Sequence, residues 1–389
     1  MKKIALVYGL ILTLCSLGAI LLETRYRNDI DLQRLFARFS VLSDRRELDA
    51  AGDLRRLATP EALKQAVALY REALARDPEN PYRWCDLGLA LLSSRQIPEA
   101  RRCYERAAAL GPNNIQTLVC VAKFYDEVNQ PREFFRYASH ILDKSPAAAK
   151  EVFPLYSRFD IRDTLTSGMP QNRVVAESYL RYVMGNNESA KAEQCWSWAT
   201  AHSLVNDSLA GEYISFLLGS SEPAKARETW AAYTGDAGLV YNSGFESEPK
   251  PSPFDWNISK LDCAEVSRDP SVRHGGKWSL RIEFDGTENV SYRHVSQFVF
   301  LDPGKYVLRG FLRTEGITTE KGIGLRVASA ATRQLTGTND WTELEQAFEL
   351  TEPTVDRLEI FRLPSERFAN KLAGTAWVDD VRITKAAGR

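Results

Sequence analysis

Residues 81–114 decide the fold of the first half of the chain, and they read PYRWCDLGLALLSSRQIPEARRCYERAAALGPNN. Apolar residues recur in this stretch at intervals of three and four, which is the spacing of one face of an α-helix. The small residues Gly88 and Ala100 fall where two such helices would cross, and Pro112 follows where the second helix has to end. The stretch therefore predicts two helices that pack closely against each other.

The same unit recurs along the chain. Pro78, Pro112 and Pro146 are each 34 residues apart, and Ala192 and Ala226 are also separated by 34 residues. This pattern resembles the tetratricopeptide repeat, most clearly at Trp84, Leu87, Gly88, Leu91, Ala100, Tyr104, Ala107 and Pro112. Because one helix pair cannot bury its apolar face alone, the resemblance implies an all-α solenoid of about five stacked pairs over residues 60–234.

A solenoid of this kind implies a concave face that holds a peptide or another protein. We therefore expect a protein partner on the concave face. The alternative is that the solenoid is only a rigid spacer for the domain that follows it.

The second half, residues 235–389, consists of short alternating runs separated by Gly, Pro, Asn and Asp. Alternation of this kind predicts β-strands. We expect strands at residues 279–284, 292–301, 306–313, 322–328, 343–350, 357–363 and 376–384. The pattern is typical of an all-β sandwich.

Several motifs in this half resemble the galactose-binding-like jelly rolls, which include many carbohydrate-binding modules. They are NSGFE at 242–246, GGKWSLR at 275–281, QFVFLDPGKY at 297–306, Trp341 with Phe348, and GTAWVDDV at 374–381. The resemblance implies a jelly-roll sandwich and, in many such domains, a structural Ca²⁺ between the first and last strands. Glu246 and Asp380 would be its side-chain ligands, since Ca²⁺ takes hard oxygen ligands. The alternative is that both acids only end a turn or a strand.

Sugar binding needs aromatic faces for stacking and planar polar groups for the hydroxyls. With a period of two, Tyr292 and His294 share one side of their strand, and Arg309, Phe311 and Arg313 share that side of the next. If the two strands pair, these five side chains form one patch, which we predict to be the glycan-binding site. The alternative is that the patch packs against the solenoid or another layer of strands.

Composition excludes several classes of function. The chain has 389 residues, with 44% hydrophobic and 26% charged, which is ordinary for a globular protein. Its 50 Lys and Arg balance 51 Asp and Glu, so it lacks the basic excess of a nucleic-acid binder. It also lacks the His-Glu-x-x-His and Gly-x-Ser-x-Gly motifs and both common glycine-rich nucleotide loops. We expect a protein that is not an enzyme and requires no cofactor.

The N-terminus begins with Met-Lys-Lys and continues with 19 uncharged residues, 4–22. At 1.5 Å per residue such a helix nearly spans a bilayer core of about 30 Å. We predict that residues 1–25 are a transmembrane anchor; a cleaved signal and, through Cys15, a lipoprotein are the alternatives. Residues 26–59 would be a linker or capping helix. The bulk of the chain would then lie on the periplasmic side of a bacterial inner membrane.

These domains together predict a non-catalytic, membrane-anchored envelope adaptor. The solenoid would bind a partner protein and the sandwich a glycan, during assembly or export of a cell-surface polysaccharide. One alternative is a purely protein–protein scaffold, with the sandwich as an interaction module. Another is a degenerate glycan-active enzyme.

Overall fold

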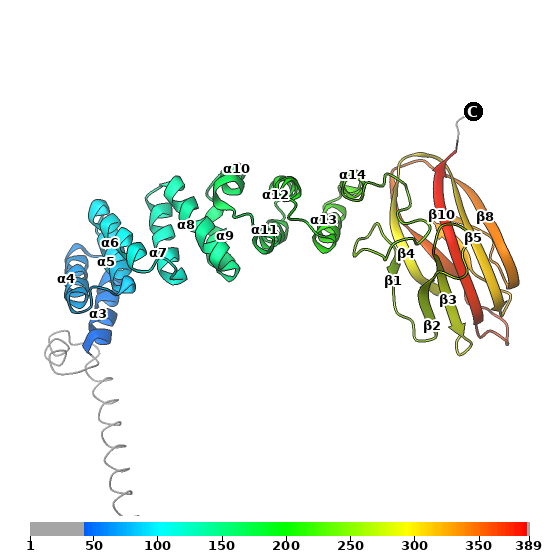
Figure 1. Ribbon diagram of the computed structural model, residues 1–389, viewed down its shortest axis with the longest axis horizontal. Helices are drawn as coiled ribbons and strands as arrows, with labels where there is room; N and C mark the ends of the chain where they lie inside the picture. Colours follow the sequence, from blue (N-terminus) through cyan, green and yellow to red (C-terminus); the bar gives the residue numbers. More distant parts are fainter. Residues whose placement is uncertain (1–42, 387–389) are drawn as a thin grey trace, which may run out of the picture. The chain divides into compact units, whose positions relative to one another are not determined.

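The computed structural model describes residues 43–386 (Figure 1). The chain forms two compact units. Unit 1 ends at Tyr179 and unit 2 begins at Leu180. The division falls within helix α11 (Arg173–Gly185), not at residue 235, where the composition changes.

Unit 1 consists of helices joined by short turns. They are α3 (Ser43–Leu57), α4 (Pro60–Arg76), α5 (Pro81–Ser93), α6 (Ile97–Leu110), α7 (Ile115–Glu127), α8 (Pro131–Lys144), α9 (Ala149–Tyr156) and α10 (Ile161–Asp163), with a π-helical turn at Thr164–Gly168. Each of α4, α5 and α7 begins after a residue whose side chain accepts a backbone N–H of the first turn: Thr59, Asn80 and Asn114. These caps satisfy N–H groups that have no partner inside the helix.

The close helix crossing predicted at Gly88 is present in unit 1. A Cβ atom on Gly88 would lie 2.9 Å from the ring of Tyr104 on α6, so only glycine lets the two helices approach this far. In the pair that follows, Phe134 takes the place of the small residue. Its ring is fully buried and stacks on Phe159 with a centroid separation of 4.9 Å.

Unit 2 begins with the end of α11 and continues with three more helices and the β domain. The helices are α12 (Ser189–Ala201), α13 (Asp207–Gly219) and α14 (Pro223–Thr234). Gly235 ends α14 in the left-handed conformation, with φ +74°, which glycine adopts without strain.

The β domain is a sandwich of two five-stranded antiparallel sheets (Figure 1). One, here called the β4 sheet, has the order β1-β4-β9-β6-β7, and the other, the β5 sheet, has the order β2-β3-β10-β5-β8. The strands are β1 (Asn257–Ile258), β2 (Ala264–Asp269), β3 (Ser279–Asp285), β4 (Tyr292–Leu301), β5 (Gly304–Ile317), β6 (Gly324–Val327), β7 (Ala330–Ala331), β8 (Gly337–Leu350), β9 (Thr354–Arg362) and β10 (Ala373–Lys385). The facing sides of the sheets share one apolar core, which includes Trp256, Leu280, Val295, Leu308, Leu358 and Val378. The predicted order, helical repeats followed by a β-sandwich, is confirmed.

The predicted inner-membrane location has to be corrected. From residue 43 to residue 386 no helix is both long enough and apolar enough to cross a bilayer. The predicted anchor, residues 1–25, lies outside the described residues, as do residues 26–42 of the predicted linker. The rest of that linker contains helix α3.

Candidate functional site

The five residues of the predicted patch do not lie on one face. Tyr292 and His294 belong to β4, whereas Arg309, Phe311 and Arg313 belong to β5, and these strands are in different sheets. The turn between the two strands carries the chain from one sheet to the other instead of closing a hairpin. The expectation that the two strands pair is therefore wrong.

Tyr292 is a core residue. It is 1% exposed, and its ring packs edge-on against Phe284 with a centroid separation of 5.2 Å. Between Tyr292 and Val295 the register shifts, because β4 holds one residue more than its partner β9. This β-bulge turns the side chain of Tyr292 inward, so Tyr292 cannot form part of a surface patch.

The outer face of the β4 sheet carries a row of polar side chains. Ser296 of β4 lies opposite Glu359 of β9, and Glu359 lies opposite Arg326 of β6. Half-buried His294 precedes Ser296 by two residues and, unlike Tyr292, is a residue of the predicted patch on this sheet that is not part of the core. Three strands of one sheet therefore bring these side chains together.

Glu359 and Arg326 form a partly buried ion pair in the middle of this row. Their side chains are 9% and 29% exposed. Nε of Arg326 donates to Oε2 of Glu359 at 3.1 Å, and Nη2 of Arg326 donates to the same oxygen. Oε1 of Glu359 has no hydrogen-bond partner within the described chain, and neither has the buried Nδ1 of His294. The face therefore has one carboxylate oxygen, Oε1 of Glu359, whose hydrogen-bonding capacity is not used internally.

Aromatic rings flank the ion pair. The guanidinium of Arg326 lies 5.2 Å from the ring centroid of Phe361. On the other side, the guanidinium of Arg357 lies 5.0 Å from the ring centroid of Phe298. Rings next to charged planar groups are the combination that the binding of a polyhydroxylated ligand requires.

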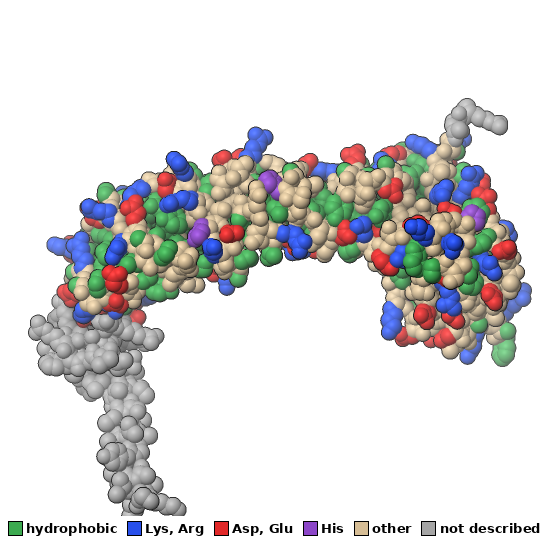
Figure 2. Space-filling view, viewed as in Figure 1, with side chains coloured by type: hydrophobic (Ala, Val, Ile, Leu, Met, Phe, Trp, Pro, Cys, Tyr) green, Lys and Arg blue, Asp and Glu red, His purple; other side chains and the backbone are tan. Residues whose placement is uncertain are grey.

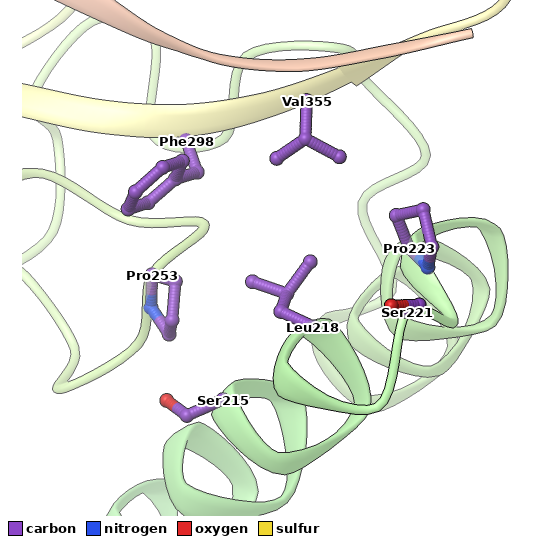
Figure 3. A pocket seen from close by; sticks show the side chains of 7 residues that line it. All are labelled: Ser215, Leu218, Ser221, Pro223, Pro253, Phe298 and Val355. Carbon is purple, nitrogen blue, oxygen red and sulfur yellow. The ribbon is translucent and has the colours of Figure 1, made fainter.

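A pocket of about 580 Å³ adjoins this row, between the β4 sheet and the helices α13 and α14 (Figure 3). It is lined by Ser215, Leu218, Ser221, Pro223, Pro253, Phe298 and Val355. Leu218 extends from its helix toward Val355, and Phe298 and Pro253 form one side of the space (Figure 3). The volume is within the range of small-molecule sites, about 300–1,000 Å³.

Polar and backbone contacts hold α13 against the sandwich. Nζ of Lys250 donates to both carboxylate oxygens of Asp207 at 2.7 Å, and the Tyr233 hydroxyl donates to Oδ1 at 2.8 Å. The hydrogen bond from Lys250 lowers the pKa of Asp207 below its usual value, so the pair is charged at neutral pH. The pocket therefore has walls that are fixed to each other within one compact unit.

The predicted side chains on the outer face of the β5 sheet already have partners within the sheet and its loops. Arg309 binds Glu345 at 2.8 Å, and Arg313 lies 3.5 Å from Asp340. The ring of His274 covers Phe311, with centroids 3.6 Å apart and planes 11° from parallel. These three predicted residues therefore share a face. The two arginines form ion pairs there, and the ring of Phe311 is covered by His274.

Glu246 and Asp380, the predicted calcium ligands, both hold the loop that precedes β3. Oε1 of Glu246 accepts hydrogen bonds from the backbone N–H groups of Lys277 at 2.8 Å and Trp278 at 3.2 Å. Asp380 accepts hydrogen bonds from Nδ1 of His274 at 2.9 Å and from a guanidinium nitrogen of Arg382 at 2.7 Å. Burial alone would raise the pKa of Asp380, but these two hydrogen bonds lower it below its usual value.

These carboxylates do not fit the oxygen-rich shell that Ca²⁺ prefers. In the structure their partners are N–H donors and not the oxygen ligands that would complete a Ca²⁺ shell. In the part of the chain that the structure describes, no three His, Cys, Asp or Glu side chains are placed to hold a metal ion. Glu246 and Asp380 fasten the loop by hydrogen bonds.

The sequence interpretation missed Glu359 and Arg326. A signal was available, because each is the charged residue between apolar neighbours in an expected strand: Leu-Glu-Ile at 358–360 and Leu-Arg-Val at 325–327. Opposite charges that interrupt two strands in this way indicate a pair across the sheet. The residues of the pocket gave no such signal, since their segments are far apart in the chain.

The comparison with known families matches residues 59–119 to the tetratricopeptide repeat model, which confirms the first resemblance. Among curated proteins, the human (Homo sapiens) cilia- and flagella-associated protein 70 is 27% identical over 106 residues. That match covers 26% of this chain and 9% of the human protein.

Similar solved structures exist for both halves. A family 61 carbohydrate-binding module, solved with β-1,4-galactotriose, is 19% identical and has a TM-score of 0.27; the match covers 38% of this chain and 99% of the module. The MamA protein is 9% identical with a TM-score of 0.26, covering 51% of this chain and 93% of MamA.

Proposed function

We propose that this protein is a non-catalytic adaptor that binds a partner protein on its helical repeats and a glycan on the outer face of the β4 sheet. The repeat match over residues 59–119 supports the first part, since stacked repeats of this kind form extended binding surfaces. The observation that carries the second part is the Glu359–Arg326 pair, in which Oε1 of Glu359 has no hydrogen-bond partner within the described chain.

The chemistry of the row suits a neutral glycan. A sugar hydroxyl both donates and accepts hydrogen bonds, so it can donate to Oε1 of Glu359 and accept from an N–H of Arg326. Because the charges of Glu359 and Arg326 neutralise each other, this row of side chains does not select a charged sugar. The ring of Phe298 offers apolar surface to the C–H face of a sugar ring, whereas Phe361 is 3% exposed and only packs against the guanidinium of Arg326.

The distribution of charge on the face seen in Figure 2 supports a neutral ligand as well. Lys and Arg side chains are interspersed with Asp and Glu over the face seen in Figure 2, without a large region of one sign. The formal net charge is −1. A surface of this kind gives no electrostatic attraction to a polyanion.

The role proposed for such an adaptor is in the assembly or export of a cell-surface polysaccharide. Two binding modules in one chain would keep a protein of that machinery close to its glycan product. Affinity electrophoresis of the full chain through gels that contain neutral polysaccharides tests the glycan part. We expect retardation by at least one polysaccharide, and a chain that none of them retards overturns it.

A second candidate is a scaffold whose sandwich binds protein. It is favoured by Val355 and Ile258, two large apolar side chains on the β4 sheet that are each 38% exposed. Cross-linking of the full chain to its partner distinguishes the two. Cross-links from the β4 sheet in the absence of any glycan support the scaffold, and cross-links from the repeats alone support the adaptor.

A further inference from the structure

The pocket beside the β4 sheet has a different chemical character from the row of Glu359 and Arg326. Five of its seven lining side chains are hydrocarbons: Leu218, Pro223, Pro253, Phe298 and Val355. Of the two serines, Ser215 already donates its hydroxyl proton to the Gly211 carbonyl at 2.8 Å, so its oxygen can only accept. A ligand in this space therefore meets mostly apolar surface.

This lining disfavours an unmodified sugar ring. Hydroxyl groups facing five apolar side chains would lose their hydrogen bonds to water and gain few in return. A methyl group on the sugar has the opposite preference, because apolar surface buried here leaves water without losing a hydrogen bond. Sugars that carry one include 6-deoxy sugars and sugars with an acetyl group.

The pocket is continuous with the polar row. Phe298, which lines the pocket, follows Ser296 by two residues on the same face of β4, and Ser296 lies opposite Glu359. Two residues along a strand correspond to about 7 Å. One glycan chain can therefore contact the ion pair and place its next unit in the pocket.

We propose that the pocket binds a methyl-bearing sugar unit, acetylated or 6-deoxy, at one end of the glycan held on the β4 sheet. This inference rests on the proposed glycan binding and adds the class of sugar. Because Leu218 belongs to α13 and Pro223 to α14, the last helix pair of the repeats takes part in selecting the glycan.

The test is isothermal titration of the full chain with two matched pairs of sugars. N-acetylglucosamine is compared with glucose, and L-rhamnose, which is 6-deoxy-L-mannose, with L-mannose. We expect the methyl-bearing member of each pair to bind about tenfold more tightly or better, as a methyl group in a fitting apolar pocket allows. Leu218→Trp fills the pocket from α13 and should remove this difference.

Further variants separate the pocket from the row. Val355→Trp fills the pocket from the opposite wall at a half-exposed position, and it should also remove the difference. Leu89→Trp, at an exposed position on α5 in unit 1, is the matched control and should change nothing. Glu359→Gln should weaken binding of a polysaccharide that retards the chain and should leave the preference within each sugar pair unchanged.

Each outcome decides one of the two claims. Equal affinities within both pairs, or a preference that survives both filling variants, overturn the pocket assignment. If Glu359→Gln still weakens binding of a polysaccharide in that case, the proposed glycan binding on the β4 sheet stands. Binding of none of the four sugars and of no polysaccharide overturns both.

Discussion

The carbonyl oxygen of Pro251 lies 1.6 Å from the point that a Cβ atom of Gly211 would occupy. The backbone of the segment leading into the sandwich therefore touches the backbone of α13 directly. With the Lys250–Asp207 pair, this contact fixes one wall of the pocket against the other.

Gly211→Ala should loosen this contact. Its Cβ would meet backbone atoms, which cannot move aside as a flexible side chain can, so we expect a loss of about 1–3 kcal/mol. Gly219→Ala on the same helix is the matched control, because a Cβ there meets nothing within 4 Å. Hydrogen exchange in peptides covering residues 250–256 should rise only in the first variant. Equal exchange in both variants would contradict the direct contact.

Asp255 should make the stability of unit 2 depend on pH. Its side chain is 0% exposed, and burial raises its pKa to about 6 despite hydrogen bonds from the backbone of Lys250 and Trp256. The folded state therefore holds this proton more tightly than the unfolded state, whose reference pKa is 3.8. The free energy of unfolding should fall by up to about 3 kcal/mol as the pH rises from 4 to 6, at about 1.4 kcal/mol per unit.

Urea unfolding of the full chain at pH 4 and at pH 7, followed by tryptophan fluorescence, measures this dependence. Asp255→Asn removes the titrating group and should flatten the profile over this range. Asp262→Asn is the control, since that side chain is 98% exposed. A profile that is the same in wild type and Asp255→Asn would show that Asp255 does not hold its proton as described.

Cys120 should be the most reactive thiol of the described residues. The neighbouring Cys85 thiol lowers the pKa of Cys120 to about 7. Burial raises the pKa of Cys103 to about 11 and that of Cys195 to about 12. Since the thiolate is the nucleophile, iodoacetamide at pH 7 should alkylate exposed Cys120 at least about tenfold faster than these two.

Cys85→Ala removes the neighbouring thiol and should slow alkylation of Cys120 at pH 7 but not at pH 10. Peptide mapping by mass spectrometry measures both rates. If Cys120 is alkylated at unchanged rates at both pH values in Cys85→Ala, the Cys85 thiol does not activate Cys120.

Calcium should not stabilise the sandwich. A specific ion at a hundred times its Kd would add about 2.7 kcal/mol to the folded state, and thermal unfolding would detect this readily. We expect the same Tm in excess CaCl₂ and in excess chelator. Glu246→Gln, which keeps one acceptor oxygen, should lower Tm slightly and equally in both. A Tm that rises with calcium only in the wild type would restore the calcium site.

The sequence pattern located single elements well and their pairing poorly. Residues 292–301 were predicted as a strand, and β4 has the same bounds, because alternation along a strand is a local property. Which strand pairs with which is not local, so β4 and β5 were placed side by side although they belong to different sheets. The bulge near Tyr292 adds one residue and reverses the side to which that ring points. A pattern of period two cannot reveal such a reversal.

The helical repeats were easier to predict because each unit carries its own markers. Gly88, Tyr104 and Pro112 lie within one repeat, and the contact that they specify is between neighbours in sequence. The pocket shows the opposite case, since Leu218, Pro253 and Val355 come from three distant segments.

Titration of a neutral polysaccharide that retards the full chain tests the central claim most directly. The chain is compared with Glu359→Gln on the β4 sheet and with Glu345→Gln, which alters the exposed pair with Arg309 on the β5 sheet. We predict that Glu359→Gln weakens binding about tenfold or more, or about 1.4 kcal/mol, while Glu345→Gln binds like the wild type. Undiminished binding by Glu359→Gln, or a loss confined to Glu345→Gln, would contradict the account.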